Sequence, residues 1–304
     1  MNDVMDKTVK FGENLSAEKS FVERVPPHLF FFVSAVFHYL GPAFAVLLFA
    51  RVSVTGVAWL RIASAALIFA VWRRPWKILR NQTRSQIGVL FALGLTLGLM
   101  NVCFYQAIAR LPLGTVGAIE FIGPISLAAI GMRTRRNLAA LILAAAGGWI
   151  LTGAGFSGAS VGFLFAFANC LLFVLYIILG HKIAESGGAE GIDRLGMAML
   201  FALLTVFPVG IGGAIPAIVE PKLLLAGIGV GICSSVIPYV CDQLAMARLS
   251  RATFSLLLAL LPASAVIIGV VALHQIPTVW ELTGILLVGV GIALHKEKAV
   301  KNQS

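Results

Sequence analysis

The sequence predicts an all-α membrane protein with ten transmembrane helices arranged as two inverted five-helix repeats. Three observations lead to this prediction. The 304-residue chain is 59% hydrophobic and only 12% charged, whereas soluble domains carry roughly 25% charged residues. Apolar stretches about long enough to cross a bilayer recur along the whole chain. The basic residues between these stretches gather in alternate loops, as they do in multi-pass membrane proteins.

The apolar segments follow one another with brief connections, so consecutive helices are expected to pack as antiparallel neighbours. They are 29–50, 54–72, 87–109, 112–132, 137–153, 159–180, 195–215, 223–246, 252–273 and 279–295. The fifth and tenth are short for a membrane span. We expect repeats at 29–153 and 159–295, with polar tails at 1–28 and 296–304. The first tail has no apolar core, so no signal peptide is predicted.

The distribution of lysine and arginine predicts the orientation of the chain. With the N-terminus inside, 19 of the 23 basic residues fall in inner tails and loops, and three fall outside, namely Arg51, Arg110 and Lys222. Loops rich in Lys and Arg stay in the cytoplasm. Both termini are therefore predicted to be cytoplasmic. A bacterial inner membrane is the expected location, because outer-membrane proteins cross as strands of barrels.

The two halves share a short match without gaps. Residues 106–124 read QAIARLPLGTVGAIEFIGP, and residues 244–262 read LAMARLSRATFSLLLALLP. Ala-Arg-Leu, one threonine and the final proline coincide. Five spans per half is an odd number, so the second copy would be inverted relative to the first. Inverted repeats are common in secondary transporters, whose substrate site lies near the membrane midplane where the repeats meet.

Glu120 is the central candidate functional residue, because it lies in the middle of the apolar stretch 111–132. Ionisable residues inside a membrane usually face a bundle interior or a wet cavity. Arg61 and Asn101 lie at the same depth, about 12 Å from the outer ends of their helices. We expect Arg61 to pair with Glu120, since a buried charge is tolerated when paired. A structural latch that never meets a substrate is the alternative for both residues.

The remaining candidates are weaker. Tyr105 shares a helix face with Asn101, and both could orient a solute by hydrogen bonds. Asp242 is expected near the inner end of its helix, in contact with solvent. His38 and Asn169 lie near the middle of theirs, where a lone histidine is more often a packing residue.

Pro124 and Pro262 are predicted helix kinks or hinges near the midplane of the fourth and ninth helices. A proline inside a membrane helix leaves a backbone carbonyl that neighbouring groups must satisfy. Matching kinks in the two repeats would suit a binding site or a rocking motion.

Several classes of function are excluded by what the sequence lacks. It has no phosphate-binding glycine loop, no H-E-x-x-H and no nucleophile elbow, so neither an enzyme nor a cofactor is predicted. The four cysteines form no C-x-x-C pair and have no histidines at ligand spacing, so no metal is expected. The net charge of +10 is explained by orientation in the bilayer rather than by nucleic-acid binding. Expected partners are a small-molecule solute, protons and lipid, and the oligomeric state is left open.

At the level of motifs the chain resembles the EamA-domain branch of the drug/metabolite transporter superfamily, and within it the RhtA-type threonine/homoserine exporters. The likeness is carried by MNVCFYQAIARLPLGTVGAIEFIGPISLA (100–128), VAWLRIASAALIFAVWRRPW (57–76) and SSVIPYVCDQLAMARLSRATFSLLLALLP (234–262). It implies amino-acid efflux in exchange for protons. The chain departs from the family pattern at Leu261, where members usually place a Glu, and at His274-Gln275, where an acid is often found.

The resemblance and the residues together predict a secondary transporter that exports small amino acids by alternating access, with antiport of protons. Glu120 would bind the ammonium group or a proton, and Arg61 would pair with Glu120 or anchor a carboxylate. Two alternatives stay open: an exporter of another metabolite or drug, and a non-transporting membrane receptor or assembly protein.

Overall fold

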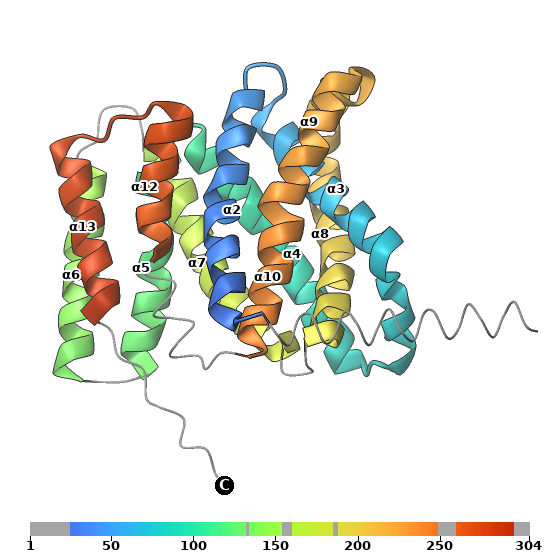
Figure 1. The fold of residues 1–304 in the computed structure, drawn as a ribbon, viewed down its shortest axis with the longest axis horizontal. Coiled ribbons are helices and arrows are strands. Elements are labelled where there is room, and N and C mark those ends of the chain that lie inside the picture. Colours follow the sequence, from blue (N-terminus) through green and yellow to red (C-terminus); the bar gives the residue numbers. More distant parts are fainter. Residues whose placement is uncertain (1–24, 132–133, 154–159, 185–187, 249–259, 295–304) are drawn as a thin grey trace, which may run out of the picture.

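The regular elements of the computed structural model are all helical in the part of the chain that it describes, residues 25–131, 134–153, 160–184, 188–248 and 260–294. Figure 1 shows them side by side as one bundle. The first half contains α2 (Pro27–Leu48), α3 (Val54–Arg73), the short 3-10 helix η1 (Pro75–Asn81), α4 (Arg84–Ile108), α5 (Leu113–Gly131) and α6 (Arg135–Gly153). The second half contains α7 (Ser160–Ala184), α8 (Gly188–Val219), α9 (Pro221–Gly231), η2 (Ile232–Val236), α10 (Ile237–Met246), α12 (Leu260–Leu273) and α13 (Val279–Leu294).

Each predicted apolar segment coincides with a helix or a run of helices, with boundaries that move by several residues. The segment predicted at 252–273 lies partly outside the described residues. Six helices of the described part are long and apolar enough to cross a membrane, and others are shorter apolar helices. The chain is therefore a helical membrane protein. Ten crossings in two repeats stay a prediction.

One difference from the sequence prediction is a break in the segment 223–246. Between α9 and α10 the chain forms one π-helical turn, η2, in which the N–H of Ile237 bonds to the carbonyl of Ile232. Single π turns inside α-helices occur frequently at functional sites.

The distribution of polar side chains is the reverse of that in a soluble protein. Large apolar side chains are exposed on the outside of the bundle, as with Trp149 (78% exposed) and Val71 (81% exposed). Charged and amide groups lie inside, including Arg61, Asn101, Glu120, Asn169 and Asp242. Such a surface suits hydrocarbon, and the buried polar groups mark where function is expected.

Glycines allow the closest helix crossings. A Cβ on Gly56 of α3 would overlap the backbone of Gly213 on α8, and a Cβ on Gly147 of α6 would lie 2.6 Å from the carbonyl oxygen of Gly284 on α13. Gly94 and Gly98 of α4 pack on α8 in the same way. Small residues at interfaces let membrane helices approach closely, because packing rather than hydrophobicity holds them together.

Helices of the two halves pack in an ordered pattern. α3 packs on α8, α5 on α12 and α6 on α13, so the second, fourth and fifth spans of the two halves touch their counterparts. The third span of each half packs instead on the first span of the other half, α4 on α7 and α10 on α2. This exchange is expected of two halves related by a two-fold axis. In Figure 1, α2 begins and α13 ends at the same end of the bundle.

Candidate functional site

Glu120 lies inside the bundle, 2% exposed, and receives hydrogen bonds from both halves of the chain. The Tyr39 hydroxyl on α2 donates to Oε2 at 3.1 Å. The Asn169 amide on α7 donates to Oε1 at 2.9 Å. His38 Nε2 lies 3.8 Å from Oε2. Glu120 is therefore held at the junction of α2, α5 and α7.

Gly117, one turn before Glu120, makes room for this arrangement. A Cβ at Gly117 would lie 3.0 Å from the Tyr39 hydroxyl and 2.8 Å from the Cβ of Ala265 on α12. The small-residue face expected around Glu120 thus serves close approach of α2 and α12 at this position. The side chains of Pro124 and Pro262 lie outside the described part, although α5 and α12 continue past both residues. Their role as hinges stays a prediction.

Arg61 forms the second charged centre of the interior and is 4% exposed. Its Nε donates to the Ser235 hydroxyl at 2.8 Å, and a terminal nitrogen donates to the Ser234 carbonyl at 2.6 Å. The guanidinium carbon lies 5.4 Å from the centroid of the Tyr105 ring, within cation–π distance. Arg61 on α3 therefore binds the η2 turn of the second half.

Pro238 explains why that carbonyl is available. In a regular α-helix the carbonyl of Ser234 would accept from the N–H of residue 238, and proline has none. The π turn and the proline together leave an acceptor inside the membrane that neighbouring groups must satisfy. Arg61 does so. Gly41 on α2 lets the turn lie close, since a Cβ there would overlap the Ser234 hydroxyl.

The expected ion pair between Arg61 and Glu120 is not formed in this structure. Each has its own partners, and within the described residues no carboxylate lies at ion-pair distance from Arg61. Both residues do lie in the interior of the bundle. Equal depth along two helices does not determine which faces of the helices meet. A pairing in another conformation stays a prediction.

Tyrosine side chains surround the two charged centres. All four tyrosines of the chain are at most 2% exposed. Tyr239 on α10 interacts electrostatically with Arg61, Glu120 and Asp242, and its ring lies 5.7 Å from that of Tyr176 on α7. The hydroxyls of Tyr105, Tyr176 and Tyr239 have no hydrogen-bond partner of good geometry within the described residues, although that of Tyr105 lies close to Arg61 and Ser234.

The other predicted residues have mixed outcomes. Asn101 is buried, and its amide donates to the Leu97 carbonyl of its own helix at 2.7 Å, with Tyr239 nearby. Asn169 and His38, the weaker candidates, both lie against Glu120. The expectation that Asp242 contacts solvent was wrong. Asp242 is only 7% exposed, and it accepts a hydrogen bond from the Ser34 hydroxyl at 2.5 Å, because α2 covers this face of α10.

Sequence reasoning missed five residues of the site: Ser34, Tyr39, Tyr176, Ser234 and Tyr239. The block SSVIPY carried one signal that could have found some of them, because it places two hydroxyls one turn before a proline and a tyrosine. Nothing in the spacing of Tyr39 or Tyr176 shows that they face Glu120 and Tyr239.

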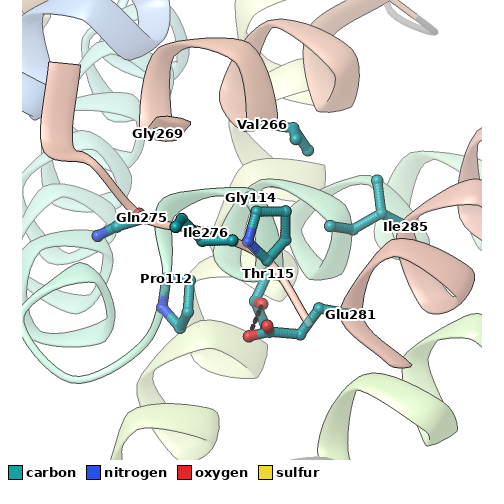
Figure 2. A pocket seen from close by; sticks show the side chains of 10 residues that line it. Pro112, Gly114, Thr115, Val266, Gly269, Gln275, Ile276, Glu281 and Ile285 are labelled. Carbon is teal, nitrogen blue, oxygen red and sulfur yellow. Dashed lines mark hydrogen bonds between the residues drawn. The ribbon is translucent and has the colours of Figure 1, made fainter. Parts of the chain in front are cut away.

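A separate pocket lies at the opposite end of the bundle from the start of α2, where α5 begins near the α12–α13 connection (Figure 2). Glu281 in this pocket accepts from Thr115 at 3.3 Å and from the backbone and hydroxyl of Thr278 at 2.8 and 2.9 Å. It completes a capping box at the start of α13. This carboxylate is satisfied by local donors, so its role is structural.

The two departures from the family pattern have structural counterparts. Leu261 is 4% exposed, so an apolar side chain stands in the interior where family members usually carry an acid. Gln275 accepts from the N–H of Leu113 at 3.0 Å and so caps the start of α5. Neither residue adds a charge to the interior.

Comparison with known proteins agrees with this architecture. Residues 160–295 match the EamA-like transporter family. Over 269 residues the chain is 30% identical to the threonine/homoserine exporters RhtA of Salmonella typhimurium and of Escherichia coli K12, covering 86% of this chain and 90% of each relative. A crystal structure of a chain with 20% identity aligns with a TM-score of 0.54, covering 90% of this chain and 98% of that chain. At that identity the likeness concerns the fold alone.

The apolar helices and the similarity to these exporters together define a multi-pass membrane transporter with a small-molecule substrate. The chain belongs to the EamA-domain drug/metabolite transporter superfamily, in the group of the RhtA-type exporters. It is an exporter and not an enzyme.

Proposed function

We propose that the protein exports small zwitterionic amino acids of the threonine or homoserine type across the bacterial inner membrane, in exchange for protons. Ten transmembrane helices in two inverted repeats, with both termini in the cytoplasm, would provide alternating access. The packing of counterpart spans of the two halves supports this arrangement. The names of the relatives support the substrate class.

One observation carries the proposal. The interior holds a cation, Arg61, and a carboxylate, Glu120, that are not paired with each other, with unpartnered tyrosine hydroxyls around them. A zwitterion has the complementary pair of charges. Its carboxylate would bind near Arg61, whose planar guanidinium suits carboxylates, and its ammonium group near Glu120. The tyrosine hydroxyls would hydrogen-bond the bound solute.

Both charged residues are held by partners from the opposite half. Glu120 of the first half accepts from Asn169 of the second, and Arg61 of the first half donates to the η2 turn of the second. A rocking motion of one half against the other would change these contacts. Substrate binding and alternating access would therefore be coupled at the same residues.

The experiment is threonine counterflow and efflux in proteoliposomes, with analogues that lack one charge. Wild type should exchange threonine, while threoninol (no carboxylate) and N-acetylthreonine (no ammonium) should compete poorly. Glu120→Gln should lose the stimulation of efflux by an inward proton gradient, because the amide cannot carry a proton. The control Glu220→Gln changes an exposed acid that pairs with Arg51 at the surface, and should behave as wild type.

Three results would contradict the proposal. Transport of cationic drugs without threonine exchange would indicate a different exporter. Absence of any solute flux, with full tolerance of Glu120→Gln, would indicate a receptor or assembly protein. Undiminished proton-driven efflux by Glu120→Gln would move the coupling carboxylate elsewhere.

A further inference from the structure

His38 lies between the two buried carboxylates of the interior. Its Nε2 is 3.8 Å from Oε2 of Glu120 on α5. Asp242 on α10 lies within electrostatic range of the ring but beyond ion-pair distance. Glu120 belongs to the first half of the chain and Asp242 to the second. His38 on α2 is therefore an imidazole near an acid from each half.

The same face of α2 continues this line toward the end of the bundle where α2 begins. Ser34 lies one turn before His38, and its hydroxyl donates to Asp242 at 2.5 Å. Asp242 is four residues from the end of α10, or about 6 Å along the axis, whereas Glu120 lies deeper, near the middle of α5. Asp242, His38 and Glu120 thus form a line from near one end of the bundle to its middle.

Few other titratable groups face this line in the described part of the chain. Imidazole is the side chain that ordinarily exchanges protons near neutral pH, whereas thiols, phenols and guanidinium do so at increasingly higher pH. The groups that interact with Glu120 or Asp242 are Tyr39, Tyr176, Tyr239, Cys170 and Cys241. Arg61 acts on Tyr239. η2 contributes the half-buried Cys233, α9 has only Lys222 at its far, exposed end, and α12 has none.

We propose that His38 passes protons between Asp242 and Glu120 and so joins the proton route of the second half to the substrate site of the first. Protonated Glu120 gives its proton to Nε2 of the ring, and Nδ1 gives its proton to Asp242, toward the cytoplasmic end of the bundle. Glu120 ends ionised, Asp242 ends neutral and the ring stays neutral in its other tautomer. A shift of about 1 Å brings Nε2 within hydrogen-bond distance of Glu120, and the ring must also approach Asp242, with which it forms no hydrogen bond in this structure.

This inference rests on the proposed function, in which a proton on Glu120 replaces the substrate ammonium. It adds a residue to that mechanism and assigns a role to Asp242, whose burial the function does not otherwise use. The transfer steps would be needed for coupling to protons and not for exchange of one amino acid for another.

The test compares His38→Gln with the control His28→Gln, which changes an exposed histidine at the start of the same helix. Each variant is reconstituted, and three quantities are measured: threonine counterflow without a proton gradient, the stimulation of efflux by an inward gradient, and the pH profile of efflux. His38→Gln should keep counterflow, lose the stimulation and show a flat pH profile. His28→Gln should match wild type in all three.

Asp242→Asn provides the second variant and should also lose the stimulation while keeping counterflow. The proposal is overturned if His38→Gln keeps the wild-type stimulation and pH profile. Should His38→Gln fold poorly, Asp242→Asn decides, and a wild-type stimulation in that variant overturns the proposal. A wild-type protein without threonine counterflow would instead refute the proposed function, which separates the two failures.

Discussion

Tyr39 and Tyr239 are buried to the same degree, yet their hydroxyls differ in what they contact. That of Tyr39 donates to Glu120 at 3.1 Å, whereas that of Tyr239 has no partner of good geometry in the described part of the chain. A hydrogen bond to a charged acceptor contributes about 1.5–3 kcal/mol to stability, and an unpartnered buried hydroxyl costs about 1–3 kcal/mol. The two tyrosines therefore differ: Tyr39 is bonded to the buried acid, whereas the hydroxyl of Tyr239 has Asn101 close to it.

Tyr39→Phe and Tyr239→Phe should therefore have opposite effects. Tyr39→Phe should lower the free energy of unfolding by about 1–3 kcal/mol. Tyr239→Phe should leave it unchanged or raise it, while the KM for threonine rises about tenfold, equivalent to about 1.4 kcal/mol of binding. Denaturation in detergent and counterflow kinetics measure the two quantities. An unchanged KM in Tyr239→Phe would show that the hydroxyl does not bind the solute.

Arg61 makes contacts that a lysine cannot reproduce, because its Nε and a terminal nitrogen donate in two directions to the η2 turn. Arg61→Lys should reduce both folded yield and threonine counterflow, since the Ser234 carbonyl loses a donor inside the membrane. Arg51→Lys is the matched control. Arg51 pairs with Glu220 at the surface, where an ion pair contributes about 0–1 kcal/mol. Equal losses in the two variants would contradict the assigned role of Arg61.

At the scale of elements, the interruption of the span α9–η2–α10 shapes the site. It combines a π turn, a proline that removes one backbone donor, and glycines that let other helices approach. A Cβ at Gly231, just before the turn, would overlap the Ser64 hydroxyl and lie 2.9 Å from the Arg61 carbonyl oxygen. Gly229, two residues earlier on α9, has open space around it. The approach of α3 to this span thus depends on Gly231, and on Gly227 against Leu60, but not on Gly229.

Gly231→Ala should destabilise the protein by about 1–3 kcal/mol, because α3 and α9 must move apart, and transport should fall as Arg61 leaves the turn. Gly229→Ala should be neutral or stabilise by up to about 1 kcal/mol, since alanine favours helix more than glycine does. Thermal unfolding in detergent and counterflow compare the two variants. Similar behaviour of both would mean that the crossing of α3 and α9 is not tightly packed.

At the scale of the whole molecule, orientation in the membrane can be tested directly. We expect both termini in the cytoplasm, since 19 basic residues fall in predicted inner segments and three in outer ones. Reporter fusions at each terminus should both give the cytoplasmic signal. α2 begins and α13 ends at the same end of the bundle (Figure 1), so reporters on opposite sides would contradict the fold as well as the inverted repeat.

Much of the fold could be predicted from the sequence. Each membrane helix satisfies its own backbone hydrogen bonds and is therefore visible in the sequence as an apolar segment. The break at η2 could not, since a π turn depends on what neighbouring helices offer to the freed carbonyl. Glu120 and Arg61 were found because charge in an apolar segment is rare. Asn169 and His38 were among the weaker candidates, but Tyr39 and Ser234 were not found, because tyrosine and serine are ordinary residues in such segments.

The sequence by itself determined the class of protein, the positions of the helices and the presence of buried charges, since these follow from hydrophobicity counted along the chain. Only the tertiary structure decided which side chains meet. Arg61 binds the η2 turn rather than Glu120, Asp242 is covered by α2, and His38 lies beside Glu120. The reason is that the rotation of each helix about its own axis is set by glycine crossings and hydrogen bonds with helices far away in the sequence.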